Sequence, residues 1–282
     1  MAAIDFLNPA PLMWDFEHEP ERSRLLDRYA IEYTTPANCA AQLAAGEADF
    51  GLIPIAAYAS IPSLLIVPGC AIASLDRVRS ILLVVRHEGG IAAVRRVAMD
   101  NSSLTSCAYA RILFARFWKI PAEFVSHPPD LEKMLASADA ALLIGDPALV
   151  ALEGRDSRER RTGERLLYLD LAHEWHTLTG LSWVAAFWAL RRDAIEETGV
   201  DPEALIQDLQ RSRDHGLEHV EDLVAEWSAR IAVPAATIRL YLMTNIHYTL
   251  DDDCWRCLEA FYRYAAECGA LPSAPRLSLL RP

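Results

Sequence analysis

The sequence is short of positive charge. Its 27 lysine and arginine residues are outnumbered by 39 aspartate and glutamate residues, which gives a formal net charge of −12 over 282 residues. A surface that binds nucleic acid normally carries a basic stripe, so this balance argues against DNA or RNA as a partner. A small anionic ligand is still compatible with it, because local hydrogen-bond donors rather than net charge define such a pocket.

Cysteine is also scarce. Its six residues are scattered along the chain and do not resemble a disulfide framework. Cys254 and Cys257 form one C-x-x-C motif beside Trp255. A zinc or redox site would need a second such pair or a βαβ context, and neither is present. The sequence therefore predicts neither a metal nor a cofactor.

A long uninterrupted hydrophobic segment is missing, and so is a basic leader. Residues 52–75 carry no charge and are long enough to span a bilayer, but three prolines and Gly69 divide them into short pieces. Buried strands joined by turns explain this composition better than a membrane helix does. The N-terminus, MAAIDFLNPAPL, has no basic region, unlike a secretory signal. We therefore expect a cytoplasmic protein with no membrane partner.

What the chain does have is enough apolar material for two lobes. Hydrophobic residues make up 52% of the sequence, and the length allows two units of roughly 100 to 150 residues each. Residues 43–59, LAAGEADFGLIPIAAYA, and residues 135–151, LASADAALLIGDPALVA, follow the same order of helix, strand, turn and helix. This similarity suggests two lobes built on one plan, although chance similarity of segments rich in alanine and leucine is an alternative.

Two apolar strands have the positions expected of connections between such lobes. Residues 79–86, RSILLVVR, would run from the first lobe to the second, and residues 183–190, WVAAFWAL, would return. The predicted lobes are then residues 1–85 with 185–282, and an inserted lobe of residues 86–184. Helices separated by Gly, Pro and Asp signals follow Arg191 and complete the first lobe. The charged segment 155–165 is interpreted as an exposed loop.

One stretch combines a strand, a cluster of hydroxyl side chains and a helix. Residues 97–99 are typical of a buried strand and residues 108–114 of a helix, so residues 101–106 form the turn between them. A helix N-terminus has unpaired N–H groups and the positive end of the helix dipole. With hydroxyls added, such a turn suits a carboxylate or a phosphate. Ordinary N-capping by one of the hydroxyls also fits the pattern.

Several blocks of the sequence resemble one family in their order along the chain. They are DFLNPAPL, GLIPIAAYA, PGCAIASLDRVRSILLV, MDNSSLTS, PPDLEKMLASADAALLIGDPAL, LDLAHEWHTLTGLSWVAAFWA and NIHYTLDDD, between residue 5 and residue 253. Together they are similar to the chorismate dehydratases of the futalosine route to menaquinone. The resemblance implies an α/β type II periplasmic-binding-protein-like fold, with two lobes, a hinge and an interlobe cleft. It also implies a lyase that dehydrates chorismate, a small dianion, to 3-[(1-carboxyvinyl)oxy]benzoate.

The resemblance further implies roles for the residues at matching positions. Asn8, in the F-L-N motif, and Ser80, in the V-R-S motif, fall on the family's two catalytic polar positions. The positions that would bind substrate are the hydroxyl loop, which receives a carboxylate, and the acid of the G-D-P motif: Ser102, Ser103, Thr105, Ser106 and Asp146. In the family the hydroxyl loop usually has an arginine where this chain has Leu104. If that arginine contacts substrate, carboxylate binding is weaker here; if it is structural, its replacement by Leu104 changes nothing.

Each of these assignments has a structural alternative. Asn8 fits a simple turn former, Ser80 a strand hydroxyl bonded to backbone, and Asp146 a helix cap. None of the eight histidines lies in a motif expected to face the cleft. Two other functions fit the same fold, namely a dihydroxynaphthoate synthase, which uses a catalytic histidine in its own motif, and a non-catalytic binder of small anions. The sequence does not indicate an oligomeric state.

Overall fold

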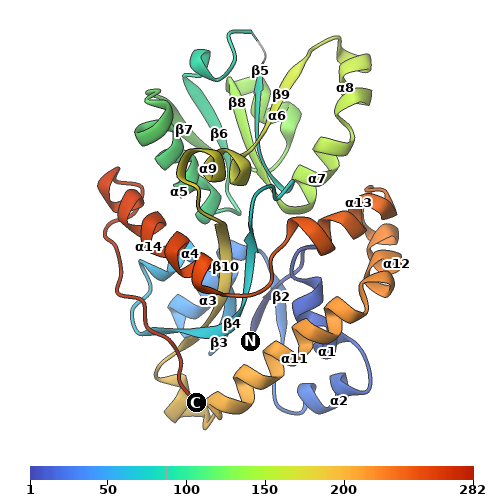
Figure 1. Cartoon of the computed structure of the whole chain (residues 1–282), viewed down its shortest axis with the longest axis vertical. Helices are drawn as coiled ribbons and strands as arrows, with labels where there is room; N and C mark the ends of the chain where they lie inside the picture. Colours follow the sequence, from blue (N-terminus) through green and yellow to red (C-terminus); the bar gives the residue numbers. More distant parts are fainter. Residues whose placement is uncertain (87) are drawn as a thin grey trace.

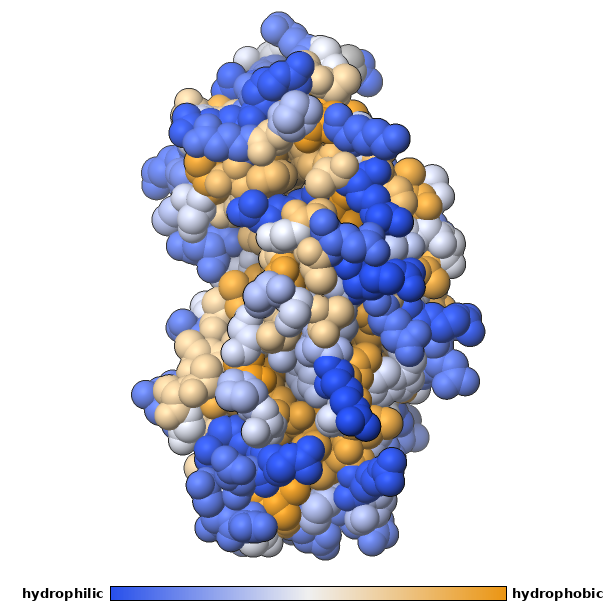
Figure 2. Space-filling model, turned by 90° about the vertical axis from the view of Figure 1, so that its left-hand side faces the viewer, coloured by the Kyte–Doolittle hydropathy of each residue, from blue (hydrophilic) through white to orange (hydrophobic). Residues whose placement is uncertain are grey.

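The computed structural model describes residues 1–86 and 88–282 as two α/β lobes, one above the other in Figure 1. Each lobe is built on one five-stranded sheet, with strand orders β2-β1-β3-β10-β4 and β7-β6-β8-β5-β9. The outline narrows to a waist between the lobes (Figure 2). The predicted two-lobed α/β architecture is confirmed.

The first lobe contains the helix, strand and helix expected across residues 43–59, as α3, β3 and α4. β1 runs parallel to β2 and β3, whereas β10 is antiparallel to β3 and β4. Thr35 accepts a hydrogen bond from the N–H of Asn38 and caps α3, which ends at Gly46 in the left-handed conformation with φ +74°. The elements of this part are β1 Ala2–Ile4, η1 Ala10–Met13, α1 Trp14–Glu17, α2 Glu21–Leu26, β2 Glu32–Thr34, α3 Pro36–Ala45, β3 Phe50–Pro54, α4 Ile55–Tyr58, β4 Leu64–Ser74 and β10 Trp183–Arg191.

The second lobe contains β5, a strand that is buried on both faces. Alternate side chains of this strand pack into different cores: Leu82 and Val84 lie in a small core on one face, while Leu83 and Val85 join the main core on the other. The elements of this lobe are β5 Ile81–Arg86, η2 Ile91–Ala93, β6 Arg96–Asp100, α5 Thr105–Ile112, η3 Leu113–Trp118, β7 Glu123–His127, α6 Leu131–Ser137, β8 Ala140–Ile144, α7 Gly145–Glu153, α8 Arg155–Thr162, β9 Leu166–Asp170 and α9 Leu171–Thr179.

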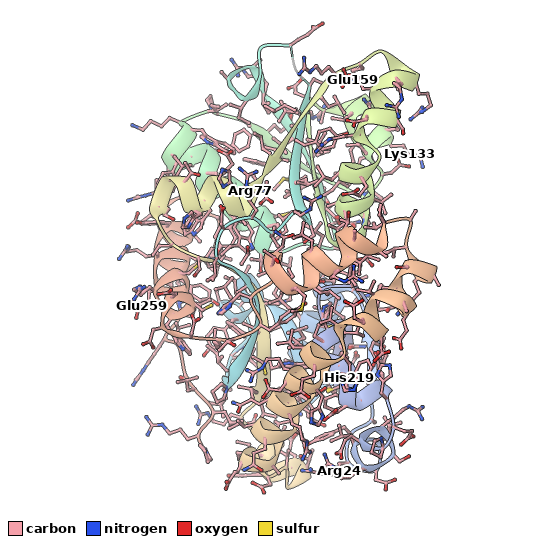
Figure 3. All side chains as sticks on the ribbon, turned by 45° about the vertical axis from the view of Figure 1, so that its right-hand side comes forward. Arg24, Arg77, Lys133, Glu159, His219 and Glu259 are labelled. Carbon is pink, nitrogen blue, oxygen red and sulfur yellow. The ribbon has the colours of Figure 1, made fainter. Side chains whose placement is uncertain are left out.

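The predicted boundary at residues 85 and 86 places β5 in the wrong lobe. This strand pairs with β8 and β9 of the second sheet, so the first crossing is the segment 75–80. Arg77, labelled in Figure 3, lies in that segment near the waist. The return crossing ends before Trp183, because β10 already belongs to the first sheet from that residue. A strand buried on both faces is a continuous apolar run, and such a run does not reveal which sheet it joins.

The C-terminal part is helical, as predicted. α14 packs against both α5 of the second lobe and β10 of the first, so it lies beside the waist. None of the helices in the described part of the chain is both long and apolar enough to cross a membrane. The elements are α10 Ala194–Thr198, α11 Pro202–Glu218, α12 Val220–Arg230, α13 Ala235–Leu240, the π-helix η4 Tyr241–Asn245 and α14 Asp252–Glu267.

The charged segment 155–165 is not the predicted loop. It contains the helix α8, which carries one buried arginine: Arg158 is only 8% exposed and pairs with Glu132 at 2.9 Å and Glu164 at 2.7 Å. Glu159 of the same helix points to solvent (Figure 3). Glu132 of α6 anchors the helix through Arg158. A sequence of interleaved charges does not predict such a tertiary contact.

Candidate active site

A cavity lies between the two lobes, beside the segment that connects them. The cavity volume is about 50 Å³, and the cavity is partly open to solvent. Most of the wall is apolar, with Phe6, Ile72 and Ile144 among the larger side chains. Its polar side chains are Asn8, Ser80, Ser103, Thr105 and Ser106, and among the described residues none that lines the cavity carries a formal charge. Any anion bound here is therefore held by neutral donors and by the helix dipole.

Asn8 follows β1 and lies at the start of a stiff turn. Pro9 precedes the short helix η1, and Pro11 lies within it. The Oδ1 atom of Asn8 is buried and has no hydrogen-bond partner among the described residues. A turn former would bond its own backbone, and this side chain does not. An unpaired buried acceptor is costly, so its position in the cavity wall favours a ligand that donates to it.

Ser80 lies at the end of the first crossing and is 2% exposed. The residue before it, Arg79, has a φ of +63°, which is rare for a side chain of this size, and its N–H donates to Asp170 at 2.7 Å. The carbonyl of Ser80 accepts from the N–H of Gly145 at 2.8 Å. Its Oγ accepts from the hydroxyl of Tyr241 at 2.6 Å. The Ser80 hydroxyl is thus bonded to another side chain, and sequence reasoning missed Tyr241 altogether.

The four hydroxyls before and at the start of α5 have three different roles. Ser102 donates to Asp100 at 2.6 Å and does not line the cavity. The Oγ1 of Thr105 accepts from the N–H of Ala56 and donates to the carbonyl of Ala185, so its only proton is already used. Ser103 accepts from the N–H of Ser106 at 3.2 Å and keeps its own proton. Ser103 thus bonds a backbone N–H of α5, while the Ser103 and Ser106 hydroxyls line the cavity and donate to no acceptor among the described residues.

Leu104 is the departure from the family pattern in this loop. Its side chain is 41% exposed. It lines both the cavity and a wider groove that continues between α3 and β7. A longer, charged side chain at this position would extend into the cavity, whereas Leu104 brings no charge to its wall.

Asp146, near the start of α7, connects the lobes. Its Oδ1 accepts from the N–H of Leu7 at 3.1 Å, and it neither lines the cavity nor caps its own helix. Burial raises the pKa of its carboxyl to about 6, against smaller opposite effects of the Leu7 N–H and of Arg230. The residue is therefore placed to hold the chain next to Asn8 and not to touch a ligand.

Replacing Asp146 with asparagine is expected to stabilise the protein at high pH. The folded protein binds this proton more tightly than the unfolded chain, whose aspartates titrate near 4, so the native protein loses stability between about pH 4 and pH 6. Asp146→Asn keeps the acceptor for Leu7 but never ionises. We expect its free energy of unfolding to exceed that of the native protein by about 2 kcal/mol at pH 8, after allowance for partial solvation.

Urea denaturation at pH 8 and pH 4.5 measures this difference, which should fall to about a third of its pH 8 value at the lower pH. Asp156→Asn is the control, because that side chain is 72% exposed and its loss should change stability by no more than about 0.5 kcal/mol. A lower stability of Asp146→Asn at pH 8 would contradict the prediction.

Histidines and metal-binding groups lie away from the cavity. No described histidine lines it, and His87 lies outside the described residues. His247, Asp251 and Cys254 form the one group of described residues whose atoms are close enough to share a metal. Asp251 accepts from His247 at 2.6 Å and also caps α14, so these groups already have partners in the protein. Cys257 of the C-x-x-C motif instead lies 3.2 Å from the Tyr109 hydroxyl.

Comparison with known proteins bears on both family and fold. A family model described as menaquinone biosynthesis matches residues 1–267. The chorismate dehydratase of Thermus thermophilus is 30% identical over 259 residues, which cover 89% of this chain and 90% of that protein.

Solved structures share the fold at much lower identity. A protein from Archaeoglobus fulgidus superposes with a TM-score of 0.68 at 15% identity, over 96% of this chain and 97% of its own. The periplasmic aliphatic sulphonate binding protein of Escherichia coli gives a TM-score of 0.63 at 12% identity, over 100% of this chain and 92% of its own. The periplasmic-binding-protein-like fold expected from the sequence is confirmed.

Proposed function

The chain belongs to the menaquinone biosynthesis family that includes the chorismate dehydratases, and from this premise we propose that it dehydrates chorismate to 3-[(1-carboxyvinyl)oxy]benzoate. A cytoplasmic location fits such a biosynthetic step. The observation that carries the proposal is the cavity itself, which the unpaired oxygen of Asn8 lines together with Ser80 and the free hydroxyls of Ser103 and Ser106.

The reaction requires little of the protein beyond orienting the substrate and its reacting groups. In chorismate a ring hydroxyl lies next to the carbon that bears the enolpyruvyl ether. Cleavage of the C–O bond to that hydroxyl and loss of the neighbouring proton release one water and make the ring aromatic. The products are strongly favoured, so the protein mainly has to position groups and assist one proton transfer.

The cavity residues divide these tasks between them. Asn8 and Ser80 hydrogen-bond the departing hydroxyl and the side-chain carboxylate. Ser103 and Ser106 hold the ring carboxylate at the N-terminus of α5, where exclusion of water strengthens each bond. Since no described titratable side chain lines the cavity, the enolpyruvyl carboxylate of the substrate itself accepts the proton. Thr105 and Asp146 support this geometry by joining the two lobes.

The two alternative functions have less support. A dihydroxynaphthoate synthase would use a catalytic histidine, whereas the described histidines lie outside the cavity. A non-catalytic binder shares only the fold with this chain, because the sulphonate-binding protein is 12% identical.

Incubation of the purified protein with chorismate tests the proposal. We expect the substrate mass to fall by about 18 units, the mass of one water, and a benzoate absorption to appear in the ultraviolet spectrum. Protein that binds chorismate but returns it unchanged would favour the non-catalytic binder and refute the dehydratase.

A further inference from the structure

We propose that Tyr241 is a positioning residue that orients the hydroxyl of Ser80 towards the substrate. The inference rests on the proposed function, because it assigns a role within the same cavity. Tyr241 does not line the cavity and touches no substrate. It acts through Ser80, to which its hydroxyl donates at 2.6 Å.

Tyr241 comes from a distant part of the chain that packs beneath the crossing. It is the first residue of the π-helix η4, which continues directly from α13. The side chain is fully buried. Burial also raises the pKa of the phenol above its ordinary value, so the group is protonated and able to donate at neutral pH. A π-helical turn inside a helix is often found at a functional site, and here it begins at this tyrosine.

The bond from Tyr241 decides what the Ser80 hydroxyl can do. A serine hydroxyl has one hydrogen and two acceptor positions. One acceptor position is occupied by the Tyr241 proton, while the Ser80 carbonyl is already bonded to the N–H of Gly145. The serine proton therefore remains available for the cavity, and its direction is restricted by the tyrosine. Without that bond the hydroxyl can rotate and donate elsewhere.

Substitution of Tyr241 by phenylalanine tests the inference in the whole protein. We expect kcat for chorismate to fall about tenfold, the effect of one neutral hydrogen bond. We expect KM to change less than twofold, because Tyr241 does not touch the substrate. A merely structural role would lower the melting temperature without separating kcat from KM. Unchanged kcat in Tyr241→Phe would overturn the inference.

Tyr248→Phe is a matched control. Tyr248 is 4% exposed, and its hydroxyl has no hydrogen-bond partner among the described residues. The same oxygen is removed from a similarly buried ring, yet kcat should stay within twofold of the native value. An equal loss in both variants would show that any buried tyrosine hydroxyl has this effect, and the inference would be wrong.

A double-mutant cycle separates the positioning role from a general one. In a Ser80→Ala background, Tyr241→Phe should cause no further loss of kcat, because the hydroxyl that it orients is gone. A further tenfold loss would contradict the inference. The native protein is measured alongside. If the native protein leaves chorismate intact, the proposed function fails and the inference fails with it. If the native protein dehydrates chorismate but Tyr241→Phe has the same kcat, only the inference fails.

Discussion

Replacement of Asn8 by alanine is expected to lower kcat for chorismate by about 10²- to 10³-fold, the usual effect of removing one donor or acceptor aimed at the reacting group. The amide lines the cavity and its Oδ1 is buried without a partner. It therefore contributes no bond to the fold, so its removal should cost little stability. The expected result is a folded protein with almost no turnover, measured by product absorbance and by thermal unfolding.

Asn101→Ala is the control for this experiment. Asn101 is exposed and lines the neighbouring groove instead of the cavity. The same substitution there should leave kcat within twofold of the native value. Near-normal turnover in Asn8→Ala would remove Asn8 from the mechanism, and a large loss of stability would mean that it is a structural turn residue after all.

The parts of the site that sequence reasoning found have local signatures. The hydroxyl loop is recognisable because a strand, a run of Ser and Thr and a helix follow one another within residues 97–114. The role of each hydroxyl, in contrast, depends on the groups that it contacts in the folded protein. Thr105 is bonded to Ala56 and Ala185 from the other lobe, and Ser102 turns back to Asp100. Only the three-dimensional structure shows which hydroxyl is free.

Tyr241 and Asp146 show the same limit at longer range. Tyr241 is 161 residues away from Ser80 in the sequence, and nothing near it differs from the other tyrosines of the chain. Asp146 fits a helix cap by its position, but its carboxylate accepts from Leu7 across the cleft. Such contacts depend on how two elements pack against each other in the folded protein. The hydrophobic periodicity of the sequence does not contain that information.

For the fold, the reliable signals were caps and buried runs. Thr35, Pro36 and Gly46 delimit α3, since each satisfies a backbone requirement within its own helix. The boundary between the lobes was less certain, because β5 is equally apolar on both faces. Helix α8 was missed because Arg158 is stabilised by Glu132, which lies on another helix. Local propensity predicts an element well only where local groups satisfy it.

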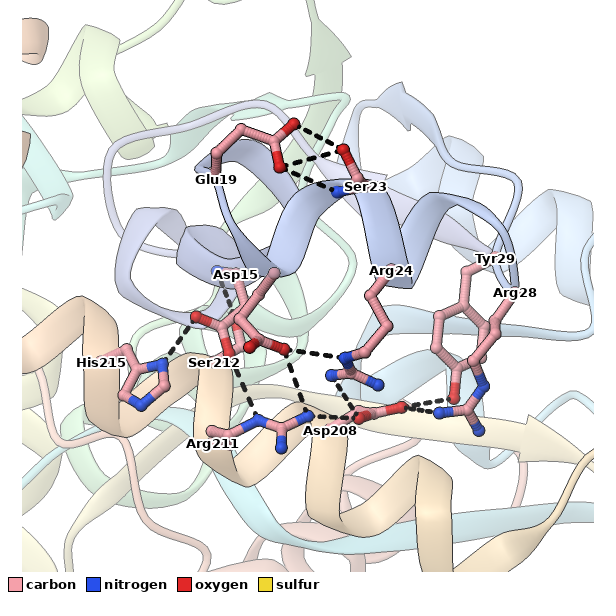
Figure 4. Close-up of polar contacts among 11 residues, drawn as sticks. Asp15, Glu19, Ser23, Arg24, Arg28, Tyr29, Asp208, Arg211, Ser212 and His215 are labelled. Carbon is pink, nitrogen blue, oxygen red and sulfur yellow. Dashed lines mark hydrogen bonds and ion pairs between the residues drawn. The ribbon is translucent and has the colours of Figure 1, made fainter.

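A buried carboxylate at the far end of the first lobe joins the helix α2 and the turn after it to α11 (Figure 4). The side chain of Asp208 on α11 is 4% exposed and accepts from Arg24 at 3.0 Å, Arg28 at 2.5 Å, Tyr29 at 3.1 Å and Arg211 at 2.8 Å. Two of these arginines come from α2 and the residues after it. The network therefore fastens the α2 region to α11. The same helix supports the chain after Asn8, since Ser212 donates to the carbonyl of Leu12.

Asp208→Ala is expected to destabilise the protein by about 3 kcal/mol. Removing one partner of a buried ion pair usually costs about 3 to 5 kcal/mol, because the remaining charge loses its compensation. We expect a loss at the lower end of this range, because the three arginine side chains are 36% to 42% exposed and can be solvated. Arg24 and Arg211 would also repel each other once the carboxylate between them is gone. Chemical denaturation at pH 7 measures the loss.

The control for that loss is Asp214→Ala on the same helix. Asp214 is 56% exposed and pairs with Arg213 alone, so its removal should cost no more than about 1 kcal/mol. Because Asp208 lies outside the cavity, turnover of chorismate by the folded fraction should remain within twofold of the native value. A loss below 1 kcal/mol for Asp208→Ala would mean that Glu21, which already contacts Arg24 and Arg211, is enough to hold these helices together. A loss of turnover with stability intact would instead indicate that the network governs the position of Asn8 through Leu12.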